Sequence, residues 1–197
     1  MPAPDCRRRL PYSCTVALCV QVMIAECIAT VVADPSNARA ILDCGGHMAV
    51  ASLLARPVPQ LQRAAATAIS SVGRNGGPAA AAAFMEGGAV EPLAAMLRAG
   101  VASQPGSNEQ LVAIDALQAL ATLSSDPRAA NVMVTSCLDA LFELVEKWRE
   151  VGVQQQMTYL LLNLSKCSSQ VRDKMVETTN IGSMMSESPT PPPAPHC

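Results

Sequence analysis

The stretch LQRAAATAISSV, residues 61–72, carries the pattern that decides the fold of this chain. Its small and apolar residues fall at positions i, i+4, i+7, i+8 and i+11, which is the spacing of one face of an α-helix. They are Leu61, Ala65, Ala68, Ile69 and Val72. The same arrangement recurs 41 residues earlier, 51 residues later and 41 residues beyond that. We call each occurrence a five-position face.

All members of the other three five-position faces are also small or apolar. They are Val20, Ile24, Cys27, Ile28 and Val31; then Val112, Ala116, Ala119, Leu120 and Leu123; then Val153, Met157, Leu160, Leu161 and Leu164. A period near 41 residues, with one stretched unit, predicts a helical solenoid in which each unit packs only on its neighbours.

A second repeated pattern lies between these helices. The segment ILDCG, residues 41–45, aligns with FMEGG, residues 84–88, at an offset of 43. Gly45 and Gly88 are expected to end a short helix by adopting a positive φ angle. A second helix is then expected at residues 48–55 and at 90–98. In the third unit Ser136 stands where the glycine would be, so a less sharp turn is predicted there.

Each unit therefore consists of a short helix, a sharp turn, a second helix and a longer third helix. Together with GGAVEPLAAML at 87–97 and LLLNL at 160–164, this organisation resembles the armadillo repeat over about residues 16–178. HEAT repeats have a similar period but usually two helices per unit, and the glycine turn favours armadillo. The resemblance implies an all-α, right-handed armadillo-type solenoid of about three repeats with partial ends.

Proline and glycine positions predict the unit boundaries. Asp34-Pro35 and Asp126-Pro127 suit helix starts, because the missing N–H of a proline would be unpaired at the first helical position. An inserted loop at 99–108 accounts for the stretched unit. The expected organisation is a flexible N-terminus 1–14, a partial repeat 15–33 (third helix only), repeats 34–74, 75–126 and 127–166, a partial repeat 167–182 (first helix) and a proline-rich disordered tail 183–197.

The N-terminal helix is strongly apolar, whereas repeat arrays need polar caps. We therefore expect a fragment or short isoform of a longer array, with self-association through uncapped repeat ends. The alternative for residues 14–33 is a secretory signal behind three arginines. Glu26 and the shared repeat phase disfavour that reading and also a membrane span.

Composition excludes several functions. The net charge of −2 gives no bulk attraction to nucleic acid. Eight cysteines without a CxxC motif are expected to be free thiols in a reducing, cytoplasmic setting. Cys44 and His47 are the nearest approach to a metal pair, across a predicted turn, so neither a metal nor a cofactor is expected. His47 and His196 are the two candidate catalytic bases and neither has a triad context, so we expect no enzyme.

The armadillo resemblance implies a concave groove lined by third helices, in which asparagines hold the backbone of an extended peptide. The matching positions here are Thr30, Ser71, Thr122 and Asn163. An aromatic residue one turn earlier remains only at Tyr159. We therefore expect a protein or peptide partner in this groove, either a helix or a short non-basic peptide. The alternative, that these residues simply finish their helices in contact with solvent, remains open.

Trp148 lies between charged residues near the end of a predicted helix. It is a possible interface residue, because exposed tryptophans often dominate binding energy, and the alternative is that it covers the core. The expected function is a non-enzymatic protein–protein interaction scaffold or adaptor. An autoregulatory segment of a larger multidomain protein and a peptide cargo carrier are the alternatives.

Overall fold

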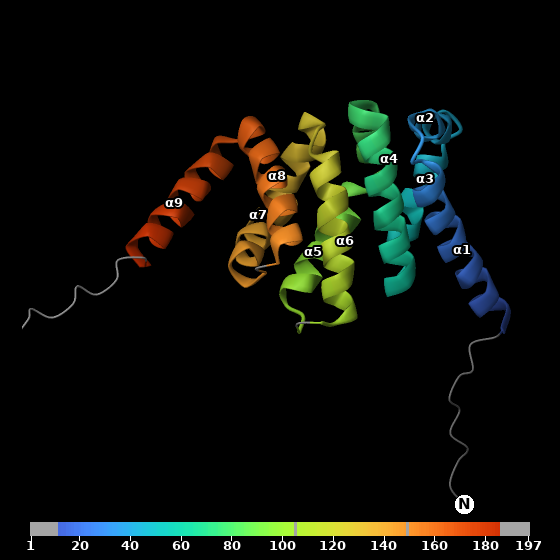
Figure 1. Ribbon diagram of the computed structural model, residues 1–197, viewed down its shortest axis with the longest axis horizontal. Helices are drawn as coiled ribbons and strands as arrows, with labels where there is room; N and C mark the ends of the chain where they lie inside the picture. Colours follow the sequence, from blue (N-terminus) through green and yellow to red (C-terminus); the bar gives the residue numbers. More distant parts are fainter. Residues whose placement is uncertain (1–11, 105, 149, 186–197) are drawn as a thin grey trace, which may run out of the picture.

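The computed structural model describes residues 12–104, 106–148 and 150–185 (Figure 1). Within these residues the chain forms nine α-helices and no strand. They are α1 Tyr12–Val31, α2 Pro35–Asp43, α3 Gly46–Leu54, α4 Pro59–Glu86, α5 Val90–Val101, α6 Asn108–Leu123, α7 Pro127–Lys147, α8 Val151–Cys167 and α9 Ser169–Met185. The predicted N-terminus 1–14 and tail 183–197 fall largely outside the described residues.

The helices form an all-α solenoid with two rows. Helices α1, α4, α6 and α8 stand side by side in one row, which we call the third-helix row (Figure 1). Behind it α3 packs on α4, α5 on α6, and α7 on both α5 and α8. The core lies between the two rows and includes Phe84, Leu97 and Leu141, whose side chains are fully buried.

The five-position faces explain how the two rows join. In α4, α6 and α8 every member is at most 7% exposed, as the pattern predicts. Burial of one such Leu, Ile or Val side chain is worth roughly 1.5–3 kcal/mol, so these faces hold the solenoid together. In α1 four of the same positions are exposed and Ile28 is only partly buried. This helix packs on α4, and Ala25 of α1 and Val32 just after it are buried.

The predicted glycine turns are confirmed. Gly45 has φ 74° and Gly88 has φ 71°. At each, the glycine N–H donates to a carbonyl three residues back, Leu42 or Met85, at 3.0 Å. The two glycines, which align at an offset of 43 residues, thus have the same backbone geometry.

Helix starts also follow from local chemistry. Asp34 accepts a hydrogen bond from the Ser36 amide at 2.9 Å, and Pro35 begins α2. Asp126 does the same for the Arg128 amide at 2.7 Å ahead of α7. Inside α4, Gly77 has φ 63° and ψ −150°, so a kink before Pro78 separates the longer helix from the next short one.

The third unit differs from the expected helix–turn–helix. No turn occurs at Ser136, and α7 continues without interruption from Pro127 to Lys147. Serine lacks the positive-φ freedom of glycine. Moreover, the Ser136 hydroxyl donates to Glu91 on α5 at 2.6 Å, and Arg98 donates to the Ser136 carbonyl. These contacts tie the continuous helix to α5.

Other element ends are displaced from the prediction. Helix α5 extends to Val101, so the expected loop 99–108 is confined to the stretch between Val101 and Asn108. The reason is packing, because Gly100 and Val101 are buried. Helix α1 begins at Tyr12, before the expected 15, and α9 reaches Met185, into the predicted tail.

Candidate protein-binding groove

Two hollows lie along the third-helix row. The first, between α1, α4 and α6, has a volume of about 790 Å³ and includes Glu26, Thr30, Thr67, Arg63 and Asp115 in its lining. We call it the first hollow. Arg63 and Asp115 form an ion pair across it, with Nε 2.7 Å from Oδ2, which joins α4 to α6. The charges of Arg63 and Asp115 therefore neutralise each other.

The second hollow lies between α4, α6 and α8 and has a volume of about 680 Å³. Its lining combines one cation, Arg74, with the amides of Gln118 and Gln156, the hydroxyl of Thr122 and the ring of Tyr159. Tyr159 is 50% exposed. The ring therefore offers an open aromatic surface in the row, while the amides offer both donors and acceptors.

The structure brings some of the predicted groove residues together and separates others. Thr30 lines the first hollow, and Thr122 and Tyr159 line the second. Ser71 is partly buried on α4 and Asn163 is buried on α8, and neither is part of a hollow lining. The binding roles of all five stay predictions.

The two threonine hydroxyls already have a donor role. Thr30 Oγ1 donates to the Glu26 carbonyl at 3.0 Å, and Thr122 Oγ1 donates to the Gln118 carbonyl at 2.9 Å. Each oxygen keeps lone pairs that can accept a hydrogen bond. These positions can therefore receive the N–H of a partner backbone.

Asn163 has a different environment from the one that the resemblance implies. Its side chain is 8% exposed, and Nδ2 donates to Oγ of Ser124, the residue just after α6, at 2.9 Å. Its Oδ1 accepts from Lys166 Nζ at 3.1 Å. The amide thus joins α8 to α6, and a peptide would have to displace these bonds to use it.

Sequence reasoning missed Arg74 and Asn75. The Arg74 guanidinium is exposed, has a 3.5 Å contact with Ser70 Oγ, and has no carboxylate partner among the described residues. Asn75 Nδ2 donates to the Val32 carbonyl at 2.6 Å and to the Ser71 carbonyl at 3.1 Å, which ties α4 to the end of α1. An amide and a cation just before a Gly-Gly-Pro helix break were the signal in the sequence.

Trp148 lies where α7 ends. Its side chain is partly buried against the core, and its carbonyl accepts from Gln154 Nε2 of α8 at 2.6 Å. The residue therefore supports the connection between α7 and α8, and its proposed interface role stays a prediction.

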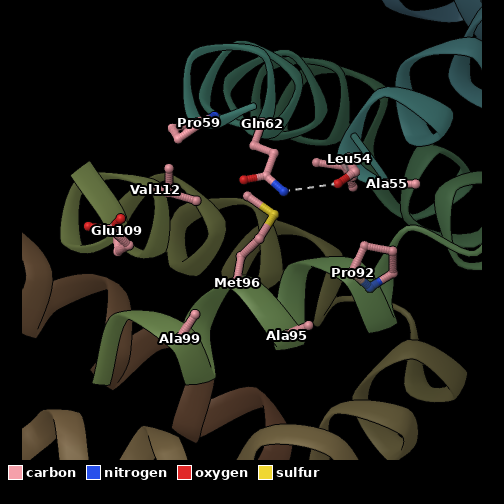
Figure 2. A pocket seen from close by; sticks show the side chains of 10 residues that line it. All are labelled: Leu54, Ala55, Pro59, Gln62, Pro92, Ala95, Met96, Ala99, Glu109 and Val112. Carbon is pink, nitrogen blue, oxygen red and sulfur yellow. Dashed lines mark hydrogen bonds between the residues drawn. The ribbon is translucent and has the colours of Figure 1, made fainter. Parts of the chain in front are cut away.

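A separate apolar pocket of about 360 Å³ lies between α3, α4, α5 and α6 (Figure 2). Figure 2 shows Met96 and Val112 facing it, and the Gln62 amide donating to the Leu54 carbonyl at 3.2 Å. That bond gives a hydrogen-bond donor to the carbonyl of Leu54, the last residue of α3, from a side chain in the first turn of α4. No predicted groove residue lines this pocket.

Other chemistry is sparse in the part of the chain that the structure describes. It contains no group of three His, Cys, Asp or Glu side chains placed to hold a metal ion. His47 packs edge-on against Phe84, with ring centroids 6.1 Å apart. No single described helix is long and apolar enough to cross a membrane. Helices α4 and α5 taken together have sufficient length and apolar composition, but they are bent by 87° relative to each other.

No family model and no curated protein matches the chain. Solved structures do. An engineered protein from the Northeast Structural Genomics Consortium superposes with a TM-score of 0.67 at 22% identity, over 86% of this chain and 67% of its own. The designed armadillo repeat protein YIII(Dq)4CqI gives 0.64 at 18% identity, over 83% and 66%.

A second designed armadillo repeat protein, YIII(Dq.V1)4CPAF in complex with the peptide (KR)4, gives a TM-score of 0.62 at 18% identity, over 79% of this chain and 61% of its own. The chain thus spans about three fifths to two thirds of the length of these structures. Identities this low speak for the fold alone. On its helix order, its stacked rows and these superpositions, the chain has the armadillo repeat fold.

Proposed function

We propose that this chain is a non-enzymatic protein–protein interaction scaffold or adaptor that holds an extended polypeptide segment along the third-helix row. The observation that carries the proposal is the pair of hollows that follow one another across α1, α4, α6 and α8. One designed protein of the same fold is in complex with a peptide, which supports a peptide as the occupant.

The charge of the second hollow favours a segment that is not basic at that point. In the first hollow Asp115 is neutralised by Arg63, which leaves Glu26 as its free acid. In the second hollow the charged lining residue is Arg74, and no carboxylate faces it within the described residues. A carboxylate pairs with guanidinium through strong, charge-assisted hydrogen bonds. We therefore propose an acidic side chain of the partner opposite Arg74, and this disfavours carriage of basic cargo.

The uncharged lining suits the rest of such a segment. Gln118 and Gln156 can each donate to and accept from a peptide backbone, and Thr122 can accept from it. Tyr159 can cover an apolar or planar side chain of the segment. These groups would orient the bound segment, while Arg74 would select for an acidic side chain in it.

The test uses two fluorescent octapeptides, one of alternating Ser and Glu and one of alternating Ser and Lys. Anisotropy titrations with the full chain should show tighter binding of the acidic peptide. Arg74→Glu should weaken that binding by about tenfold or more, because a charged hydrogen bond is worth roughly 1.5–3 kcal/mol.

Arg39→Glu is the matched control, because Arg39 is exposed on α2 and lines neither hollow. It changes the net charge equally and should leave the affinity within error. Tighter binding of the Lys peptide, or equal effects of the two substitutions, would contradict the proposal.

The proposed setting is the cytoplasm, and the proposed contacts include self-association through an exposed repeat end. Free, exposed thiols at Cys19, Cys44 and Cys167 support a reducing compartment, where such groups persist. Fractionation of cells that express the tagged chain tests this location, and recovery in a secreted fraction would contradict it.

A further inference from the structure

The five-position face of α1 is the one that the solenoid leaves open. Val20, Ile24 and Val31 are 48%, 52% and 54% exposed, whereas their counterparts in α4, α6 and α8 are at most 7% exposed. Together with Cys27, Ile28, Met23 and Ile41 they line an apolar hollow of about 400 Å³. Large exposed apolar patches on folded proteins mark interaction sites.

The other units show what kind of group belongs on this face. The face of α4 is covered by α3, that of α6 by α5, and that of α8 by α7. The cover is in each case an apolar helix. Neither flanking sequence has that pattern: MPAPDCRRRLP at 1–11 has three prolines and one leucine, and SESPTPPPAPHC at 186–197 has five prolines. A second molecule with an apolar helix face can supply this cover.

Building on the self-association proposed above, we propose that the α1 face docks on the α1 face of a second copy, with the two helices antiparallel about a two-fold axis between Met23 and Ile24. The face carries no ionised side chain, so its partner must be uncharged and apolar. The remaining exposed large apolar side chains of the described chain are spread over α3 and α6–α9. The α1 face is thus its own complement, as an isologous interface requires.

The antiparallel register places the apolar residues along α1 opposite apolar residues of the second copy. About this axis Val20 lies opposite Cys27 of the second copy, and Val16 lies opposite Val31 of the second copy. Val16 is 62% exposed and Met23 is 61% exposed, so both lie on the accessible side of α1. A single helix face is smaller than a standard specific interface of about 1,200–2,000 Å² in total, so we expect a reversible dimer that dissociates in the micromolar range.

Sedimentation equilibrium of the full chain under reducing conditions tests the proposal. The chain should pass from monomer to dimer across the micromolar range, and Ile24→Asp should raise the dissociation constant at least tenfold with unchanged helical circular dichroism. Val176→Asp is the matched control, because Val176 is exposed and apolar but lies on α9. A monomer at all concentrations overturns the proposal, and so does loss of the dimer in Val176→Asp, which would indicate head-to-tail contact.

Cross-linking tests the register. In a chain that keeps Cys27 and buried Cys137 and carries serine at the other cysteines, Val20→Cys should form an intermolecular disulfide with Cys27 on mild oxidation. Peptide mapping identifies the pair. Links of position 20 to position 20 would show parallel helices and overturn the antiparallel register. Because pairing is what brings the thiols at positions 20 and 27 together, dilution below the dissociation constant should suppress the link.

Discussion

At the scale of single residues, the turn between the short helix and the second helix depends on one position per unit. Gly45 and Gly88 occupy it with positive φ, and each short helix ends there. Ser136 occupies the aligned position in the third unit, and α7 runs through it. The chain therefore contains its own comparison of glycine and non-glycine at this turn.

Gly88→Ala should destabilise the fold by about 1–2 kcal/mol, because an L-residue in the left-handed region pays that amount. A Cβ at Gly88 would meet nothing within 4 Å, so the cost is one of backbone conformation and not of packing. Urea unfolding followed by circular dichroism measures it. Gly152→Ala is the control, since Gly152 is helical and equally open, and this change should be neutral or stabilising. Equal losses in both variants would refute the argument.

The residue scale also shows what the sequence could not predict. Periodicity identified Asn163 as a groove position, but its amide bonds to Ser124 across 39 residues. Such a bond depends on how α8 packs on α6, which a comparison of aligned repeats does not contain. Arg74 was missed for the same reason, because its lack of a carboxylate partner is a property of three helices together.

At the scale of elements, α7 begins at a capped Asp-Pro pair. Asp126 accepts from the amides of Arg128 and Ala129 at 2.7 and 3.3 Å. Asp126→Ala should cost about 1 kcal/mol in unfolding free energy, and Asp126→Asn should cost much less, since asparagine caps nearly as well. Denaturant melts at neutral pH measure both. A loss in Asp126→Asn as large as in Asp126→Ala would show that charge, not the cap, matters.

The same cap gives the chain a pH dependence. Burial acts to raise the pKa of Asp126, but hydrogen bonds from Arg128 and Ala129 outweigh it and the pKa is lowered. The pKa values of Asp34, through Ser36, and of Glu91, through Ser136 and Arg98, are lowered too. The unfolded state then binds more protons. This stability is therefore present above the unfolded pKa values of about 4 and is lost as the pH falls through the folded pKa values. Asp126→Asn should flatten the acid limb of the melting curve.

The positions of three helices could be predicted from the sequence, because each of them buries one apolar face. The recurrent pattern predicts α4, α6 and α8 because each buries that face completely. The pattern does not say where a helix ends. Helix α5 extends through Gly100 and Val101, which are buried, with Gly100 against Ala113 of α6, and Ser136 leaves α7 unbroken. Termination without a glycine or proline thus depends on tertiary contacts.

At the scale of the whole molecule, contacts join neighbours along the array. Helices α4, α5 and α6 are covered on several sides, whereas α1 has an open face and α9 contacts chiefly α8. Lys174 on α9 also pairs with Asp139 of α7 and lies 5.4 Å from the ring centroid of Phe142. In such a chain stability is close to a sum of units and their interfaces, so it varies along the length.

This organisation predicts the order of hydrogen exchange. Amides of α5 and α6 should exchange most slowly, through unfolding of the central units, while those of α9 should exchange first by local opening. Exchange in α1 should depend on concentration, because pairing of its apolar face with a second copy adds protection by mass action. Ile24→Asp should remove that dependence in α1 and leave the rates in α6 unchanged. Mass-spectrometric exchange at low and high micromolar concentration measures both. If all helices exchanged together, the array would unfold as one cooperative unit, and the neighbour-by-neighbour account of its stability would be wrong.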